Sequence, residues 1–299
     1  MEVIAKVLKE KPEKNISLLN LSVSKAKTFK ECKAKFRYTY IEKLPRKERD
    51  YHVFGKFLHE ILEKFHKMKL AGDTRPDNKI ISEAFKSAYS IWKTKLNEEQ
   101  LEESKNITKQ YLVKLDYDKK LNQESKILSV EKEFYININD KIILNGFIDR
   151  VELGQDGLIH VGDYKTTLLL DKKDPTIYFT DTEKYKRYKK DIFQLKTYAF
   201  VMMLENPDIE KIRCSFMMLR HNFHLIEKVF HRKEIMEIGD QFLEYAEKIG
   251  EEKLYRPTTT PLCGWCDHIE VCTAGQDFLV EQEERKNGVS AKNFGESNW

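Results

Sequence analysis

The sequence predicts a mixed α/β protein in which helices pack on the faces of a β-sheet. Three observations support this prediction: strand-like alternation between residues 127 and 165, helical spacing of apolar residues on both sides of that block, and another strand pattern at 211–219. Helices and strands in this order are typical of a sheet with helices on its faces. Hydrophobic residues make up 40% and charged residues 34% of the chain, which excludes a disordered protein.

The alternating block predicts three consecutive strands at 127–137, 141–153 and 157–165. Asn139-Asp140 and the Gly154-Gln155-Asp156-Gly157 run supply the turns between them. Strands joined by tight turns are antiparallel neighbours, so the second and third strands form a hairpin.

Helices are expected where apolar residues recur every three or four positions. They run from about Ser24, from about 52 to 70, through most of 78–120, from 191 to 205, and from about 233 to 250. Ser24 is suited to the cap of the first helix, and Asn206-Pro207 ends the helix over 191–205. The residues from about 71 to 125 are interpreted as a helical elaboration of the main domain. The stretch 171–190 is charged and shows no clear helical or strand periodicity.

One basic segment, Lys184–Lys190, reads KYKRYKK, with aromatic rings between the cations. Such interleaving suits a strand of nucleic acid, because rings stack on bases and cations bind phosphates. A solvated charged loop explains it equally well. The net charge of +4 permits nucleic-acid binding without indicating it.

The predicted hairpin places charged residues where apolar ones are expected. Alternation puts Asp163 and Lys165 on the face of Ile159 and Val161, and pairing brings Asp149 of the preceding strand towards Asp163. Two inward carboxylates and a lysine are costly to bury without a partner. A hard divalent cation such as Mg²⁺ or Mn²⁺ is the natural one, and it would activate water for attack on a phosphate. The alternative is a salt bridge between Asp163 and Lys165.

Three of the five cysteines form a C-x₂-C-x₅-C pattern, namely Cys263, Cys266 and Cys272. Three thiolates within ten residues indicate a metal site that needs a fourth ligand, from Cys32 or Cys214. Spacing alone favours a zinc site with four cysteines.

The hairpin sequence GFIDRVELGQDGLIHVGDYKTT resembles the core of the PD-(D/E)xK nucleases, specifically their RecB-like branch. Further similarities are a G-x-x-x-H at Gly55–His59, a Q-x-x-x-Y at Gln194–Tyr198, and the opening LSVSKAKTFKECKAKF. The resemblance spans most of the chain outside about 70–125, the charged stretch and the C-terminus. It implies a restriction-endonuclease-like mixed sheet flanked by helices.

The resemblance also implies roles for individual residues. His59, Asp149, Asp163 and the carbonyl of Tyr164 would hold Mg²⁺ or Mn²⁺, and Lys165 would be the catalytic lysine. Asp163 stands where many relatives have glutamate.

The resemblance assigns the Q-x-x-x-Y residues, Gln194 and Tyr198, to contacts with the substrate backbone or to support of Lys165. Without the resemblance, His59 could have a purely structural role. Gln194 and Tyr198 could likewise be an ordinary pair of residues on one helix face. A glycine at 55 would give clearance near His59 for a metal or substrate.

Iron-sulfur members of this branch pair one N-terminal cysteine with a C-terminal triplet. The resemblance therefore implies a 4Fe-4S cluster held by Cys32 and the triplet, with zinc as the alternative. Cys214 would then be a small buried hydrophobe.

These observations lead to one expectation about activity. The chain would be a metal-dependent DNA exonuclease acting on single-stranded ends, similar to CRISPR-associated and single-strand-specific exonucleases of the branch, in repair, recombination or phage or CRISPR DNA processing. The absence of a Walker motif leaves unwinding to a helicase or recombination partner. The alternatives are a silent DNA-end-binding module, with an iron-sulfur or zinc site, and a zinc protein that binds nucleic acid without cutting.

The expected organisation is a single nuclease domain over 1–275, with a cluster segment at about 257–275 and a polar tail at 276–299. The N-terminus lacks the apolar stretch and cleavage site of a signal peptide, so a cytoplasmic location is expected. No run approaches the roughly 20 apolar residues that span a bilayer, so no membrane is expected as a partner.

Overall fold

The computed structural model describes residues 4–12, 18–171, 174 and 176–286. Its described residues form two compact units, each made from two chain segments. The first unit draws on 1–23 and 48–244, and the second on 24–47 and 245–299. The single nuclease domain over 1–275 stays a prediction.

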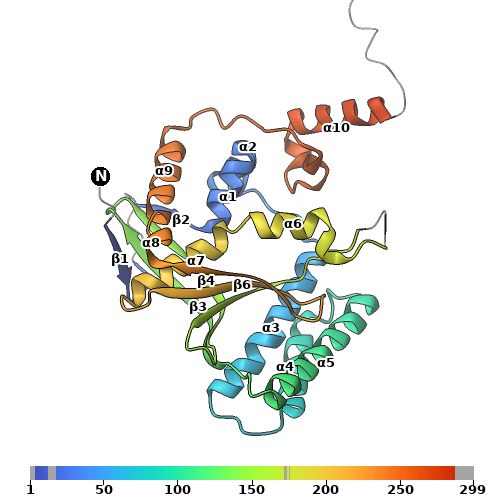
Figure 1. The fold of residues 1–299 in the computed structure, drawn as a ribbon. Coiled ribbons are helices and arrows are strands. Elements are labelled where there is room, and N and C mark those ends of the chain that lie inside the picture. The colour runs from blue at the N-terminus through green and yellow to red at the C-terminus, as the bar shows by residue number, and fades with distance from the viewer. Residues whose placement is uncertain (1–3, 13–17, 172–173, 175, 287–299) are drawn as a thin grey trace, which may run out of the picture. The chain divides into compact units, whose positions relative to one another are not determined.

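The first unit is built on a mixed sheet, which confirms the predicted fold class (Figure 1). Within the described residues it has seven strands in the order β1-β3-β4-β5-β6-β7, with β2 paired to β4. Pairings β5–β6 and β2–β4 are parallel and the others antiparallel. The strands are β1 (Ala5–Leu8), β2 (Leu19–Leu21), β3 (Lys126–Ile138), β4 (Ile142–Leu153), β5 (Ile159–Lys165), β6 (Lys211–Met218) and β7 (His224–His231).

The predicted hairpin forms with the expected register. Arg150 of β4 lies opposite Gly162 of β5, and Val151 opposite Val161. The positions of β3, β4 and β5 differ from the predicted strands by at most two residues at either end. The alternating stretch after 219 is also a strand, β7.

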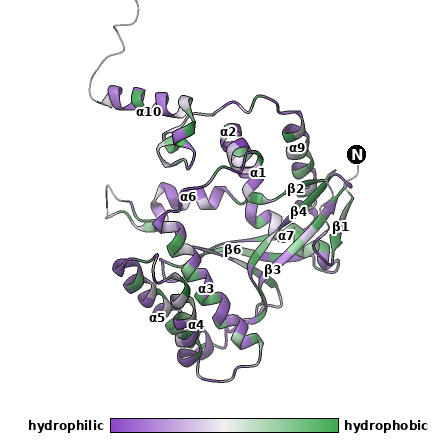
Figure 2. Ribbon diagram, turned by 180° about the vertical axis from the view of Figure 1, so that it is seen from behind, coloured by the Kyte–Doolittle hydropathy of each residue, from purple (hydrophilic) through white to green (hydrophobic). Residues whose placement is uncertain are grey.

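Helices cover both faces of this sheet (Figure 1). Three helices share an apolar core with Tyr164 and Met217 on one face, while α7 packs on the opposite face, where its Gln194 contacts Asp163. Figure 2 shows strands of mixed hydropathy and a largely hydrophilic α5. The helices of this unit are α3 (Asp50–Leu70), α4 (Asp77–Trp92), α5 (Glu98–Lys120), α6 (Glu183–Lys190), α7 (Phe193–Glu205), α8 (Arg232–Ile235) and the start of α9 (Ile238–Glu251).

The charged stretch before α7 contains a helix that the sequence pattern did not indicate. Helix α6 covers the basic segment Lys184–Lys190 and is capped by Thr182, whose hydroxyl accepts a hydrogen bond from Tyr185 N at 3.2 Å. A threonine cap of this kind satisfies an otherwise unpaired amide at the helix start.

The second unit is made of short helices. They are α1 (Val23–Glu31), α2 (Lys33–Phe36), a π-helical turn η1 (Arg37–Ile41), the 3₁₀ turns η3 (Pro261–Trp265) and η4 (Ile269–Val271), and α10 (Thr273–Lys286). Helix α10 extends into the segment expected to be a polar tail, and residues 287–299 lie outside the described part. Among the described residues, no helix is both long and apolar enough to cross a bilayer.

A buried polar network ties the helical elaboration to the hairpin. Arg150 pairs with Glu152, and its Nη1 donates to Tyr111 Oη of α5 at 2.9 Å. His160 bridges the second carboxylate oxygen of Glu152 to Ser215 Oγ, with both distances 2.8 Å. Buried polar groups of this kind are stabilising only while every member keeps its partner.

Loss of Glu152 tests this network. Burial alone would raise the pKa of Glu152, but Arg150 and His160 lower it to about 2. A depressed carboxyl pKa adds stability above the unfolded pKa, and this stability disappears as the pH falls through the folded pKa. Glu152→Gln should therefore lower the free energy of unfolding by roughly 3 kcal/mol at pH 7, and by less as the pH drops from 5 towards 3. Urea denaturation across this range measures it.

Glu227→Gln on β7 is the control, because the Glu227 side chain is 48% exposed. It should change the stability by no more than about 0.5 kcal/mol. If the loss in free energy of unfolding of Glu152→Gln stayed constant with pH, the lowered pKa of Glu152 would not be its cause.

Candidate active site

Two buried carboxylates face each other across the hairpin. The register that pairs Arg150 with Gly162 places Asp149 opposite Asp163. Asp163 is 3% exposed, and the side chain of Asp149 is 12% exposed. Asp149 Oδ2 accepts a hydrogen bond from the backbone N–H of Tyr164 at 2.6 Å. The inward orientation expected from strand alternation is therefore present.

Lys165 and helix α7 hold the carboxylate of Asp163. Lys165 Nζ lies 2.5 Å from Asp163 Oδ2, so the simple salt bridge does form. Gln194 adds a second connection, because its Nε2 donates to Asp163 Oδ1 at 2.7 Å and its Oε1 accepts from Lys165 Nζ at 3.2 Å. Tyr198 Oη donates to the same Asp163 oxygen at 3.3 Å. Gln194 and Tyr198 thus do more than pair with each other along their helix.

His59 stands between Asp149 and the backbone of Tyr164. Its Nδ1 lies 3.6 Å from Asp149 Oδ2, and its Nε2 lies 3.1 Å from the carbonyl oxygen of Tyr164. A carbonyl oxygen only accepts hydrogen bonds, so His59 Nε2 carries the proton and donates to it. His59 Nδ1 then presents a lone pair towards Asp149. Burial lowers the pKa of His59, which favours the neutral ring that binds metals.

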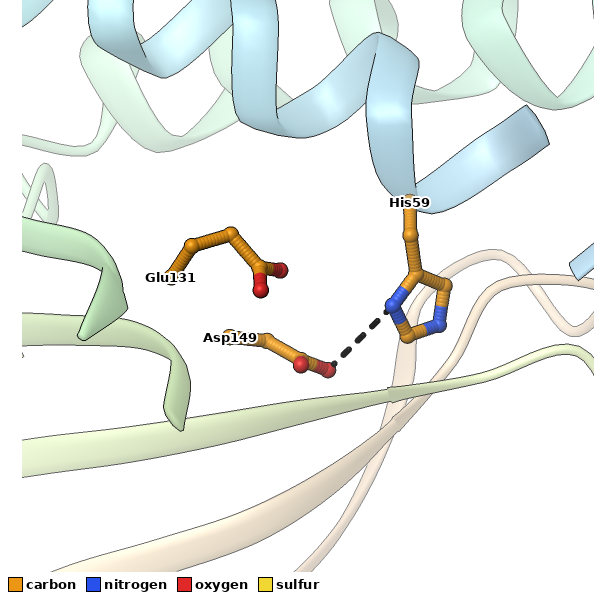
Figure 3. Close-up of side chains that lie close together, drawn as sticks. All are labelled: His59, Glu131 and Asp149. Carbon is orange, nitrogen blue, oxygen red and sulfur yellow. Dashed lines mark ion pairs between the residues drawn. The ribbon is translucent and has the colours of Figure 1, made fainter. Parts of the chain in front are cut away.

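Glu131 is a member of the site that the sequence reasoning missed. Among the described residues, one set of three histidine, cysteine or carboxylate ligand atoms lies mutually within 4.8 Å: those of His59, Glu131 and Asp149. Figure 3 shows the three side chains pointing towards one another. The β3–β4 register offered a signal, because its pairs on either side place Glu131 opposite Asp149.

The site carries an excess of negative charge. Burial raises the pKa of Asp149 to about 8, and the charge of Asp163 adds to the rise. Burial and Asp149 similarly raise the pKa of Glu131 to about 7. Burial alone would lower the pKa of Lys165, but Asp163 raises it. Three carboxylates therefore share one lysine, and this favours binding of a cation.

A groove of about 560 Å³ opens beside these carboxylates. Three lysines of α3 line it, namely Lys56, Lys64 and Lys67, together with Trp92 of α4. The helical elaboration showed no obvious chemistry in the sequence, yet it supplies this aromatic ring.

The structure gives a specific reason for Gly55 in the middle of α3. A Cβ at this position would lie 3.1 Å from Thr166 Oγ1, just beyond the end of β5. The glycine thus lets the helix approach the strand that carries Asp163 and Lys165. We expected Gly55 to leave room near His59 for a metal or substrate. The structure instead places the side chain of Thr166 next to Gly55.

The rings of the basic segment are engaged within the protein. Tyr188 Oη lies 2.7 Å from Thr167 Oγ1, and Tyr185 Oη lies 3.2 Å from His224 Nε2. Lys184 Nζ donates to the carbonyl of Leu168 at 3.0 Å. The interleaved rings therefore serve packing in this structure.

Four of the five cysteines meet in the second unit. Cys32, Cys263, Cys266 and Cys272 line one cavity of about 30 Å³. Backbone N–H groups of Thr258 and Thr260 point at the sulfurs of Cys32 and Cys263, each at 3.4 Å. Cys214 instead lies fully buried in β6 of the first unit, where burial raises the pKa of its thiol.

Comparisons with known proteins identify a nuclease superfamily. A family model described as the PD-(D/E)XK nuclease superfamily matches residues 20–273. Two relatives from Streptococcus pyogenes, serotypes M6 and M18, are each described as one of the subunits of an ATP-dependent helicase/deoxyribonuclease. Each is 38% identical over 47 residues, which make up 16% of this chain and 4% of the relative's length.

A solved structure described as "Crystal structure of SSO0001" also aligns with the chain. The alignment covers 88% of this chain and 89% of the other, with 13% identity and a TM-score of 0.32. A likeness at this level carries no argument about this chain.

Proposed function

This chain belongs to the PD-(D/E)XK nuclease superfamily, and we propose that it is a DNA exonuclease that hydrolyses phosphodiester bonds at single-stranded ends, leaving 5′-phosphates. The observation that carries the proposal is the buried set of Asp149, Asp163 and Lys165 on one hairpin, cross-linked by Gln194. A structural salt bridge would need neither the second carboxylate nor the glutamine. Residues placed in this way fit the hydrolysis of a phosphate ester.

The donor atoms present fit Mg²⁺ or Mn²⁺. Carboxylate and carbonyl oxygens are the ligands that these ions prefer, and a neutral imidazole adds one nitrogen. His59, Asp149, Asp163 and the carbonyl of Tyr164 would hold the ion. When bound, such an ion lowers the pKa of a coordinated water and offsets charge on the phosphate.

The protein's own groups have separable roles in this proposal. The raised pKa of Lys165 keeps its ammonium protonated, so it donates hydrogen bonds to the attacking water or to a phosphate oxygen. Gln194 fixes the lysine and Asp163 relative to each other, because it bonds to both. Tyr198 supports the same carboxylate from one turn further along α7.

A single-stranded substrate is proposed for the groove. Lys56 on α3 suits a phosphate, whereas Lys64 and Lys67 are paired with Glu60 and Glu63, and Trp92 offers a ring for a base. Trp92 Nε1 donates to Glu60 at 2.5 Å, which fixes the orientation of the ring. The proposed partner is a helicase or recombination protein. Two observations support it: the RecB-like pattern of the motifs, and the short match to a component of a helicase/deoxyribonuclease.

For the second unit we propose a 4Fe-4S cluster bound by Cys32, Cys263, Cys266 and Cys272. The pairing of one N-terminal cysteine with a C-terminal triplet supports the cluster over zinc, since thiolates are ligands of both. Its role would be structural, since it joins the two chain segments of this unit.

The nuclease proposal predicts metal-dependent cutting by the full chain. Single-stranded DNA labelled at the 5′ or 3′ end should be degraded with Mg²⁺ or Mn²⁺ and remain intact with EDTA. Asp163→Asn and Lys165→Ala should each lose at least about a hundredfold in rate, because removal of one electrostatic contact at a reacting centre has effects of that size.

Circular dichroism provides the control that both variants stay folded, and the label released first gives the polarity. Intact DNA after incubation with folded, metal-loaded wild type would favour a silent end-binding module. Equal rates in the wild type and Lys165→Ala would remove the lysine from the reaction.

The cluster proposal predicts iron and sulfide in the anaerobically purified protein. Cys263→Ser should lose both together with the brown colour, and it should melt at a lower temperature. Cys214→Ser is the matched control and should keep its iron, because Cys214 lies in the other unit. A colourless wild type with one zinc per chain would contradict the cluster.

A further inference from the structure

Glu131 adopts an unusual backbone conformation in the middle of a strand. Its φ is +46°, in the left-handed region that residues other than glycine rarely enter. Pairing continues on both sides, since Val130 lies opposite Arg150 and Lys132 opposite Ile148. The distortion at Glu131 leaves the β3–β4 register unchanged from Val130 to Lys132, while a separate register shift lies between Ile127 and Ser129. Strain of this kind persists where the surrounding structure imposes it, and it is concentrated at functional sites.

The carboxylate of Glu131 is also placed unfavourably for a protein without a cation. It lies with Asp149 and Nδ1 of His59 in a set of atoms mutually within 4.8 Å (Figure 3). Within the described residues, the structure gives this carboxylate no hydrogen bond and no ion pair. Two like charges held this close destabilise each other. A strained backbone and a like-charge contact at the same residue are both offset if a cation binds there.

We propose that Glu131 joins Asp149 and His59 Nδ1 as a ligand of the divalent cation. This inference rests on the proposed function and adds a third carboxylate to its metal site. The ion is then bound by β3 and α3 as well as by the hairpin. Asp163 retains its contacts with Lys165 and Gln194, so its carboxylate positions the lysine as well as holding the ion.

Mn²⁺ is the suitable probe, because it accepts carboxylate oxygens and imidazole nitrogen and is visible by electron paramagnetic resonance. Mn²⁺ is titrated into the full chain, and the Kd is compared among wild type, Glu131→Gln, Glu131→Gly and Glu133→Gln. Glu133 is the matched control: it lies two residues away on the same strand, and its carboxylate accepts a hydrogen bond from Tyr135. Urea denaturation in EDTA is measured on the same four proteins.

Glu131→Gln should weaken Mn²⁺ binding at least tenfold, whereas Glu133→Gln should bind like the wild type. Glu131→Gly should weaken binding equally and yet be at least as resistant to urea as the wild type, because glycine accepts a positive φ. Loss of affinity together with retained or increased stability is not expected of a residue with a purely structural role.

Unchanged Mn²⁺ affinity in Glu131→Gln would overturn the proposal, as would a wild type that does not bind Mn²⁺. The two proposals fail separately. If wild type binds Mn²⁺ through Glu131 but cuts no DNA, the nuclease assignment fails and the ligand assignment stands. If DNA is cut while Glu131→Gln keeps full Mn²⁺ affinity, the reverse holds.

Discussion

The mutual repulsion of Asp149 and Asp163 is the constraint on which the rest of the first unit depends. Two carboxylates opposite each other in a buried hairpin are unfavourable without compensation. The structure compensates each one differently. Asp163 receives Lys165, Gln194 and Tyr198. Asp149 receives one backbone N–H and faces His59 and Glu131, so its charge is only partly offset. A cation bound here would complete the balance, in keeping with the proposed metal site.

Strand alternation lets one hairpin carry both the candidate site and the buried contacts that stabilise it. Asp149 and Asp163 lie on one face, while their neighbours Arg150 and Tyr164 lie on the other. Arg150 connects through Tyr111 to α5, and Tyr164 belongs to the apolar core of α3, α4 and α5. The helical elaboration is therefore part of the support for the site. The same strands that carry the charges are fixed from behind by buried contacts.

Much of the site follows from sequence because it depends on short-range geometry. A period of two places Asp163 with Lys165, and a period near four places Gln194 with Tyr198. Spacing alone left Cys32 or Cys214 open as the fourth thiol, and the resemblance pointed to Cys32. The structure places Cys32 in the unit of the triplet and Cys214 in the other.

The features that sequence reasoning missed have local physical causes. Helix α6 has no apolar stripe, and its start depends on one capping threonine. Glu131 lies opposite Asp149 in the β3–β4 register, a strand pairing that the β4–β5 hairpin pattern alone does not include. The role of Gly55 depends on Thr166, more than a hundred residues away in the chain.

The most direct test of this account is the thermal stability of Asp149→Asn beside the wild type, each measured in EDTA and in Mn²⁺. Asparagine keeps the shape and can still accept the hydrogen bond from Tyr164, but it removes the charge. In EDTA the variant should be more stable than the wild type by about 1–2 kcal/mol, as expected when an unfavourable functional charge is removed. Mn²⁺ at about a hundred times its Kd should stabilise the wild type by about 2.7 kcal/mol and leave the variant almost unchanged. A variant that is less stable than the wild type in EDTA, and that still responds to Mn²⁺, would contradict the central role of this charge.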